Sequence, residues 1–319
     1  MINLSKILTE NEKERKKVSI GLTAIVSWIF LLLGIYGFKQ YGIALFILIP
    51  FFIGLSSTIL YGYKREITIR KSLRIGSLTL TVFVLGIIVF AIEGLICIAM
   101  AAPFGLLFTW FGSLIGYFIN NKINNKSLNS IIVLVFMIPT ISFIEKDIKP
   151  ELMSVVTSIE IDSDPKTVWK NIIEFPQLDE PKELIFKTGI AYPINAKIKG
   201  TGVGAVRHCN FTTGSFVEPI TLWDEPNLLK FDVLEQPASM KELSYLDIDA
   251  PHLHDYLVSK KGQFKLTSLG NGKTLLEGTT WYYHNIRPSF YWKIWSDYII
   301  HQIHNRVLVH IKKNSEKKV

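Results

Sequence analysis

Cysteine and histidine are scarce in this chain of 319 residues, and their positions exclude several classes of site. The two cysteines, Cys97 and Cys209, fit neither a disulfide framework nor the spacing of a zinc site. All seven histidines lie between His208 and His310, so the first half of the chain offers no imidazole. No serine or cysteine stands in a recognisable nucleophile motif, which disfavours a covalent hydrolase.

Charge is also unevenly distributed. Hydrophobic residues make up 49% of the chain and charged residues 19%, and the long apolar runs end near Ile144. The net charge of +8 comes largely from basic residues that flank these runs. Such residues orient a protein against a membrane, so we expect membrane lipids as partners and no nucleic-acid partner.

The first 150 residues predict a multi-pass helical membrane region. A spanning helix needs about 20 mostly apolar residues, because the hydrocarbon core is roughly 30 Å thick. The first segment is too long for a signal peptide and lacks a small-x-small cleavage site. No ion-pathway pattern or inverted repeat is present, which favours an anchor over a transporter. The expected helices are 19–38, 42–62, 76–98, 100–119 and 128–144.

Basic residues predict the orientation of these helices. They gather before the first segment, between the second and third, and between the fourth and fifth. Because Lys and Arg are retained in the cytoplasm, the N-terminus is expected there. Five crossings then place residues 151–319 outside the cytoplasm. If the short fifth segment, which contains Pro139, does not cross, that domain is cytoplasmic instead.

Glu93 is the one acidic residue well inside an expected span. Charge at membrane depth is costly and often functional. The alternative is that Glu93 lies near the outer end of its helix and reaches water or a neighbouring helix.

After "EKDIKP" at 145–150 the pattern becomes that of a mixed globular domain over 151–319. The alternating "VVTSIEI" predicts a strand at 155–161. Ser163 or Asp164 is placed to cap a helix over 163–173, with Pro165 at an early helical position. Further elements are strands near 203–212, 215–223, 228–235, 258–269 and 273–284, the last two joined by "LGNGK", and a final helix over about 288–312.

This order, opening with "IEIDSDPKTVWKNIIEFPQL", resembles the START-like, polyketide-cyclase-type helix-grip superfamily (SRPBCC) over roughly 154–314. The resemblance implies an α+β fold in which a curved antiparallel sheet wraps around the long C-terminal helix. It also implies a cavity for an apolar or lipid-like molecule, and a minority of the superfamily catalyse cyclisation or hydrolysis. The segments 206–233 and 276–308 are similar to bacterial membrane-associated members, which implies a bacterial inner or plasma membrane.

Strand alternation suggests the polar groups of such a cavity. It places Glu235 on an otherwise apolar face and groups Glu277 with Trp281 and Tyr283. Burying a carboxylate unpaired is costly, so Arg207 is the expected partner. The alternative is a structural ion pair, or strand faces that meet water. The expected ligand-binding residues are Arg207, Glu218, Glu235, Glu277, Trp281, Tyr283, Trp292 and Trp295.

The final helix carries candidates for chemistry. Asp297 and His301 are four residues apart and form a candidate general-base pair. His301 and His304 share a narrow arc, and with His252 and His254 they are candidate metal ligands. No compact metal motif is present, so we expect no metal or other cofactor. Cys209, next to His208, is either an activated thiol or an inert strand cysteine.

The sequence therefore leads to three functional hypotheses. The first is a membrane-anchored domain that binds a hydrophobic or lipid-like small molecule. Residues 236–256 are then either a lid over the cavity mouth or a segment that faces the bilayer. The second is a membrane-bound enzyme of the same superfamily, such as a cyclase, dehydratase or hydrolase. The third is a protein-interaction module without a ligand, whose partner the sequence does not name.

Overall fold

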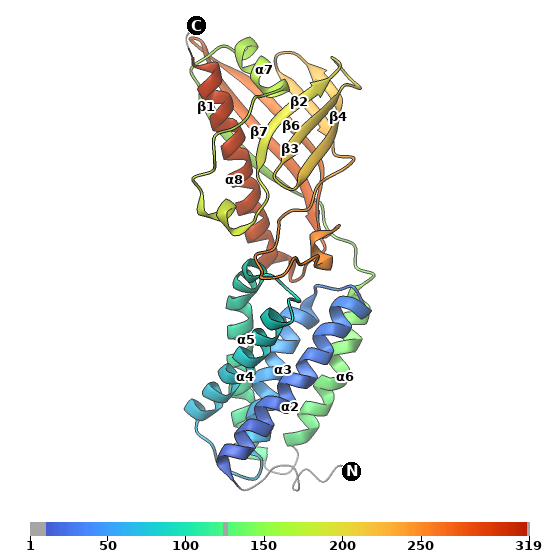
Figure 1. The fold of residues 1–319 in the computed structure, drawn as a ribbon, viewed down its shortest axis with the longest axis vertical. Helices are drawn as coiled ribbons and strands as arrows, with labels where there is room; N and C mark the ends of the chain where they lie inside the picture. The colour runs from blue at the N-terminus through green and yellow to red at the C-terminus, as the bar shows by residue number, and fades with distance from the viewer. Residues whose placement is uncertain (1–10, 124–126, 318–319) are drawn as a thin grey trace. The chain divides into compact units, whose positions relative to one another are not determined.

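The structure is a computed structural model that describes residues 11–123 and 127–317 (Figure 1). Contacts divide the chain into two compact units. The first comprises Met1–Ile148 together with the short segments Ser244–Pro251 and Ile286–Pro288. The remaining residues form the second, C-terminal unit, and each unit is described by itself.

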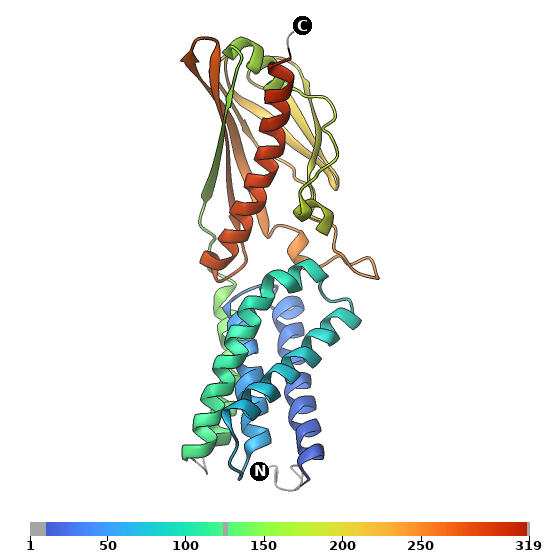
Figure 2. The same cartoon turned by 90° about the vertical axis from the view of Figure 1, so that its left-hand side faces the viewer.

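The first unit is a bundle of five helices (Figures 1 and 2). All five are long and apolar enough to cross a membrane by length and composition, which confirms five candidate spans. Two of them include a stretch of π-helix, η1 (Leu33–Gly37) after α2 and η2 (Ala44–Leu48) before α3. The helices are α2 (Glu12–Leu32), α3 (Ile49–Gly62), α4 (Ile69–Val89), α5 (Leu95–Ile123) and α6 (Ser127–Glu145).

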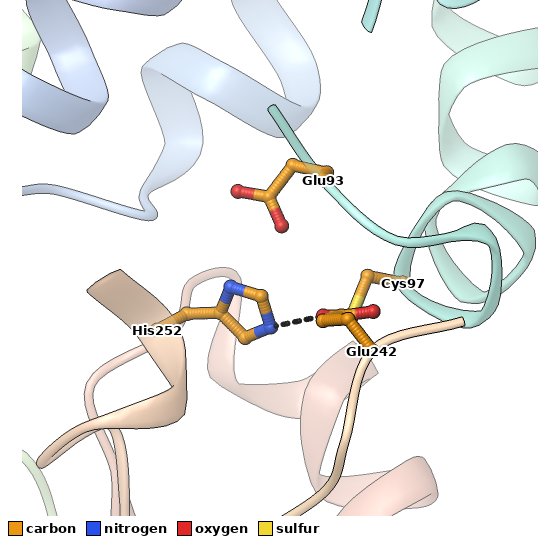
Figure 3. A group of neighbouring side chains, drawn as sticks. All are labelled: Glu93, Cys97, Glu242 and His252. Carbon is orange, nitrogen blue, oxygen red and sulfur yellow. Dashed lines mark ion pairs between the residues drawn. The ribbon is translucent and has the colours of Figure 1, made fainter. Parts of the chain in front are cut away.

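The predicted boundary between the third and fourth helices is wrong. The chain turns at 90–94, where Ala91 takes a positive φ of 49°, and Pro103 lies inside α5. Residues 76–119 are almost continuously apolar, so hydropathy does not locate the turn within them. Glu93 lies in this turn, just before Cys97 on the first turn of α5 (Figure 3). Its Oε1 accepts a hydrogen bond of 2.5 Å from the Tyr41 hydroxyl.

Glycines let α3 and α5 pack backbone to backbone. A Cβ atom at Gly54 would lie 1.9 Å from the Thr109 carbonyl oxygen, and one at Gly112 would lie 2.1 Å from the Phe51 carbonyl oxygen. Small residues serve this purpose in membrane bundles, where association depends on close packing rather than on the hydrophobic effect. The absence of these side chains therefore sets the α3–α5 distance.

The C-terminal unit has a seven-stranded antiparallel sheet in the order β1-β7-β6-β5-β4-β3-β2. The sheet curves around the long helix α8 (Ser289–Ser315), and α7 (Pro165–Ile173) follows the first strand (Figures 1 and 2). This is the predicted helix-grip architecture. The strands are β1 (Met153–Ile161), β2 (Pro193–Lys199), β3 (Val206–Phe211), β4 (Gly214–Asp224), β5 (Leu228–Asp232), β6 (Leu257–Gly270) and β7 (Lys273–His284), with short 3-10 turns η3 (Leu184–Thr188) and η4 (Pro251–Leu253).

Local signals account for most of these elements. Asp164 caps α7, because its side chain accepts hydrogen bonds from the Lys166 and Thr167 backbone N–H groups at 3.0 and 3.2 Å. The hairpin between β6 and β7 turns through Asn271, which has a positive φ of 50° between two glycines. The edge strand β2 escaped sequence prediction. Its alternate backbone groups pair with Phe175 as well as with β3, so irregular chain covers this edge of the sheet.

We expect Gly112→Ala to destabilise the first unit by about 1–3 kcal/mol, the usual cost of overpacking, although alanine has the higher helix propensity. The measurement is thermal unfolding of the full-length protein in detergent. Gly105→Ala on the same helix is the matched control, since a Cβ there meets nothing within 4 Å. Equal stability of the two variants would contradict the close α3–α5 packing.

Candidate ligand-binding cavity

A cavity of about 120 Å³ lies inside the C-terminal unit, between the inner face of the sheet and α8. Its wall is mostly apolar, with a small number of polar groups. The apolar side chains are Phe211, Phe216, Phe231, Val233, Phe264, Ile300, Ile303, Val307 and Leu308. The side chains with polar groups include Arg207, Cys209, Glu218, Thr280 and His304.

Two inward-facing glycines on neighbouring strands explain why the gap stays open here. Gly262 of β6 pairs with Thr280 of β7, and Gly278 of β7 pairs with Phe264 of β6. A Cβ at Gly262 would lie 2.5 Å from the Phe231 ring, so this ring rests on bare backbone. A Cβ at Gly278 would meet its nearest neighbour only at 3.7 Å, so that position has room for a methyl group.

The rest of the gap is packed. A large buried cluster includes Val307 and Leu308, and a smaller one centres on Tyr282 and Ile300. The cavity shares lining residues with both clusters. A cavity of about 150 Å³ holds a benzene ring, whereas drug-sized ligands occupy roughly 300–1,000 Å³. This space therefore matches one ring or a short branched chain rather than a whole lipid.

Arg207 and Glu218 form a buried ion pair at the cavity wall. The antiparallel register of β3 and β4 places the two residues directly opposite each other, and Arg207 Nη1 donates to Glu218 Oε2. Arg207 is only 2% exposed, and its Nε–H donates to the Ile173 carbonyl oxygen at 3.2 Å. Its guanidinium also lies 5.5–5.6 Å from three ring centroids, those of Phe175, Phe231 and Phe264.

This pair is costly to bury. Burial raises the pKa of Glu218, and the neighbouring Arg207 opposes that rise. Burial is the largest effect on Arg207 and lowers its pKa, but Glu218 and Cys209 together outweigh burial and the net shift is upward. Replacing buried ion pairs with apolar residues is often neutral or stabilising. A core that served only stability would not need this pair, so it is a candidate functional feature.

Cys209 lies beside this pair but is not an activated thiol. It is buried on the inner face of β3, and burial raises its pKa to about 12, with Glu218 adding to the effect. The thiolate is the nucleophilic form, so a thiol with this pKa is inert near neutral pH. Of the two alternatives that the sequence left open for Cys209, the structure supports an inert strand cysteine.

Four side chains form a second polar feature, which we call the hydroxyl–imidazole chain: Thr157, His301, His304 and Thr280. Thr157 Oγ1 lies 2.7 Å from His301 Nδ1 and 3.0 Å from His304 Nδ1. Thr280 Oγ1 lies 2.8 Å from His304 Nε2. Both nitrogens of His304 are therefore hydrogen-bonded to hydroxyl groups from β1 and β7. Thr280 and His304 line the cavity.

His304 is uncharged at neutral pH. Burial lowers its pKa to about 4, and the neighbouring His301 lowers it further. A neutral imidazole carries one N–H and one acceptor nitrogen, so it can bridge two hydroxyl groups. Its role in the structure is that of a hydrogen-bonding group rather than a positive charge.

The predicted Asp297–His301 pair is not formed. Tyr282, which is fully buried, donates its hydroxyl hydrogen to Asp297 Oδ1 at 2.5 Å, and Lys293 forms an ion pair with the same carboxylate. His301 instead bonds to Thr157. The spacing along α8 predicted that Asp297 and His301 bond to each other. In the structure each of them bonds to a residue of a strand that faces the helix.

The face of β7 predicted to carry Glu277, Trp281 and Tyr283 is the outer one. Leu276, Thr280 and Tyr282 of β7 face α8, so the residues between them point away from it. Glu277 pairs with Lys265 at 3.4 Å rather than with Arg207. Of the described residues predicted to bind the ligand, the following do not line the cavity: Glu235, Glu277, Trp281, Tyr283, Trp292 and Trp295.

The four candidate metal ligands are not brought together. His252 forms an ion pair with Glu242 of the same loop, with Nε2 and Oε1 3.0 Å apart (Figure 3). Among the residues that the structure describes, no metal-sized group joins His252 or His254 to His301 or His304. The loop 236–256 also contributes no residue to the cavity lining, so the predicted lid does not touch the cavity.

Sequence reasoning identified Arg207, Glu218 and His304 but missed Thr157, Thr280 and Gly278. The last three lie on strands where both faces carry apolar residues, so alternation alone does not say which face is inner. The signal that was present is the pair Gly278 and Thr280 at alternate positions of β7, but only the strand register brings Thr157 of β1 opposite Gly278.

We expect Arg207→Leu to destabilise the C-terminal unit by about 3–5 kcal/mol, because Glu218 is left buried without its partner. The double variant Arg207→Leu/Glu218→Leu should return to within about 1 kcal/mol of wild type or exceed it. The measurement is denaturant unfolding of the full-length protein, followed by tryptophan fluorescence. Lys265→Leu, which breaks a more exposed pair, is the control and should cost at most about 1 kcal/mol. An equal cost for Arg207→Leu and this control would contradict the argument.

Stability should fall on acidification because of His304. Its pKa is 6.5 in the unfolded chain and about 4 in the folded one. The unfolded state therefore takes up the proton first, and the fold loses about 2–3 kcal/mol between pH 7 and pH 4.5. His304→Leu should remove that part of the pH dependence, whereas His208→Leu on the outer face of β3 should retain it. Parallel pH profiles for wild type and His304→Leu would refute the assignment.

No protein-family model matches the sequence, and no curated protein matches it. Solved structures are similar to the C-terminal half at low identity. A norcoclaurine synthase point mutant from Thalictrum flavum, in complex with a transition-state analogue, is 14% identical over 53% of this chain and 97% of that one, with a TM-score of 0.35. The Aha1 dimer from Colwellia psychrerythraea is 15% identical over 51% and 96%, with a TM-score of 0.30. At these values the likenesses carry no argument about function, and the helix-grip fold rests on the strand order and on α8.

Proposed function

We propose that this protein is a membrane-anchored member of the START-like SRPBCC superfamily whose C-terminal unit binds a small, largely apolar molecule. The observation that carries the proposal is the 120 Å³ cavity between the sheet and α8, whose apolar wall contains a buried ion pair and a neutral histidine. Ligand sites typically combine a mostly apolar lining with a few precisely placed polar groups. The size of the cavity favours one ring or a short branched chain as the part of the ligand that enters.

The groups around the cavity favour binding over covalent chemistry. The Cys209 thiol stays protonated at neutral pH, and the Asp297 carboxylate is already shared by Tyr282 and Lys293. An enzyme that forms a covalent intermediate needs an activated nucleophile beside a base. Neither Cys209 nor Asp297 supplies an activated nucleophile, so binding is the better supported hypothesis.

The five apolar helices support a membrane anchor as the second part of the proposal. Tethering a binding site beside a bilayer raises its effective concentration for molecules dissolved there. The distribution of basic residues favours a cytoplasmic N-terminus, and five crossings would place the C-terminal unit on the opposite side of a bacterial inner or plasma membrane. In this arrangement the ligand would come from the bilayer or from the space beside it.

Gly278→Ala should reduce the amount of ligand that copurifies with the full-length protein, because the added methyl occupies free space in the cavity. The same variant should unfold at an equal or higher temperature, since filling a void and replacing a strand glycine both stabilise a fold. The measurement is native mass spectrometry of the full-length protein from its own membrane, together with a thermal scan. Ser158→Ala on the outer face of β1 is the control. No bound mass in wild type, or equal bound mass in Gly278→Ala, would count against the cavity as the site.

A further inference from the structure

The hydroxyl–imidazole chain has more than one way to satisfy its bonds. Thr157 has a single hydroxyl hydrogen, yet its oxygen lies within hydrogen-bond distance of the Nδ1 atoms of both His301 and His304. It can donate to only one of them, so the other imidazole must carry its proton on Nδ1. Two arrangements with opposite direction therefore satisfy all three bonds without any group becoming charged.

The direction of the chain decides what Thr280 offers to the cavity. If His304 carries its proton on Nε2, it donates to Thr280, and the Thr280 hydroxyl hydrogen is free to bond a ligand acceptor. If His304 carries its proton on Nδ1, Thr280 donates to Nε2, and its oxygen lone pairs remain open to a ligand donor. Thr280 lines the cavity, so either arrangement presents one neutral hydrogen-bonding site there.

We propose that the hydroxyl–imidazole chain recognises the polar group of the ligand and selects uncharged molecules that carry a hydroxyl or carbonyl group. This inference rests on the proposed function of the cavity. It assigns the ligand class as a neutral ring or short branched chain with one such group. Thr280 is the residue that touches the ligand, and His304, Thr157 and His301 set whether Thr280 donates or accepts.

The charges around the cavity support an uncharged ligand. Three charged residues line it. Arg207 and Glu218 pair with each other, whereas Lys261 is exposed and its ammonium lies 5.1 Å from the centroid of the Trp281 ring, on the outer face of the sheet. A ligand carboxylate or ammonium would enter an apolar space with no opposite charge left for it, which is strongly unfavourable. His304 supplies no compensating charge, because burial lowers its pKa to about 4.

The test compares three small probes of similar shape on the full-length protein in amphipol, observed by fluorine NMR. The probes are 4-fluorophenol, 4-fluorotoluene and 4-fluorobenzoate, which carry a hydroxyl, a methyl and a carboxylate at the same ring position. The fluorine NMR change seen with the Gly278→Ala variant is subtracted from the change seen with the wild-type protein. Partition of the probes into the amphipol then cancels. We expect specific binding of the phenol and the toluene, and none of the benzoate.

The decisive variant is the double change Thr280→Val/His304→Leu. It removes both partners of one hydrogen bond and leaves Thr157 paired with His301, so no new buried polar group is left without a partner. Relative to 4-fluorotoluene, binding of 4-fluorophenol should weaken about three- to ten-fold, the usual worth of one hydrogen bond. Thr280→Ser keeps the hydroxyl and should keep the phenol preference, as should the control Thr221→Val on the exposed face of β4.

Three results would overturn the inference. If the double variant binds the phenol as well as wild type relative to the toluene, the chain plays no part in recognition. If 4-fluorobenzoate binds more tightly than 4-fluorophenol, Arg207 recruits anions and the ligand class is wrong. If neither neutral probe binds beyond the Gly278→Ala reference, the cavity itself is not a site, and the proposed function fails together with this inference.

Discussion

The arrangement of the C-terminal unit depends on how the buried guanidinium of Arg207 is paired. A cation buried in a sheet–helix layer must be paired and hydrogen-bonded, and two separate elements meet this need. Glu218 comes from the neighbouring strand β4, and the Ile173 carbonyl oxygen comes from the last residue of α7. Carbonyl groups at the end of a helix lack partners within the helix, so this bond satisfies the helix and the cation together. The start of the domain is thereby fixed to β3, next to the edge strand β2.

The absence of side chains at two glycines is the second feature that shapes the interior of the C-terminal unit. At Gly262 the bare backbone accepts the Phe231 ring, which in turn covers the Arg207 guanidinium. At Gly278 the missing side chain leaves space beside Leu308 that the protein does not fill. Close packing is the rule in protein interiors, and an open, partly polar space costs stability. The C-terminal unit therefore combines two costly features, a buried ion pair and a cavity, at one place. Their coincidence is the physical argument that this place is functional.

The polar groups at the cavity fall into two kinds with different consequences. The Arg207–Glu218 pair is fixed in direction, and each charge is already matched by the other, so the pair leaves no free charge for an ion that enters the apolar space. The hydroxyl–imidazole chain is neutral and can reverse its direction, because each hydroxyl and each imidazole both donates and accepts. One feature holds the fold in register, and the other remains adaptable. A cavity built in this way suits a ligand that is apolar over most of its surface.

The sequence by itself determined the five apolar helices, the order of most strands and the long final helix, because these follow from hydrophobic period and from local signals such as the Asp164 cap and the Asn271–Gly272 turn. It also singled out Arg207, Glu218 and His304 as unusual residues. The tertiary structure decided which partners they have. Alternation shows that a strand has two faces but not which one meets α8, so Glu277 was expected inside and lies outside, while Thr280 was overlooked. Register across β3 and β4, and the packing of α8 against β1 and β7, join residues far apart in the chain. No pattern within one segment contains that information.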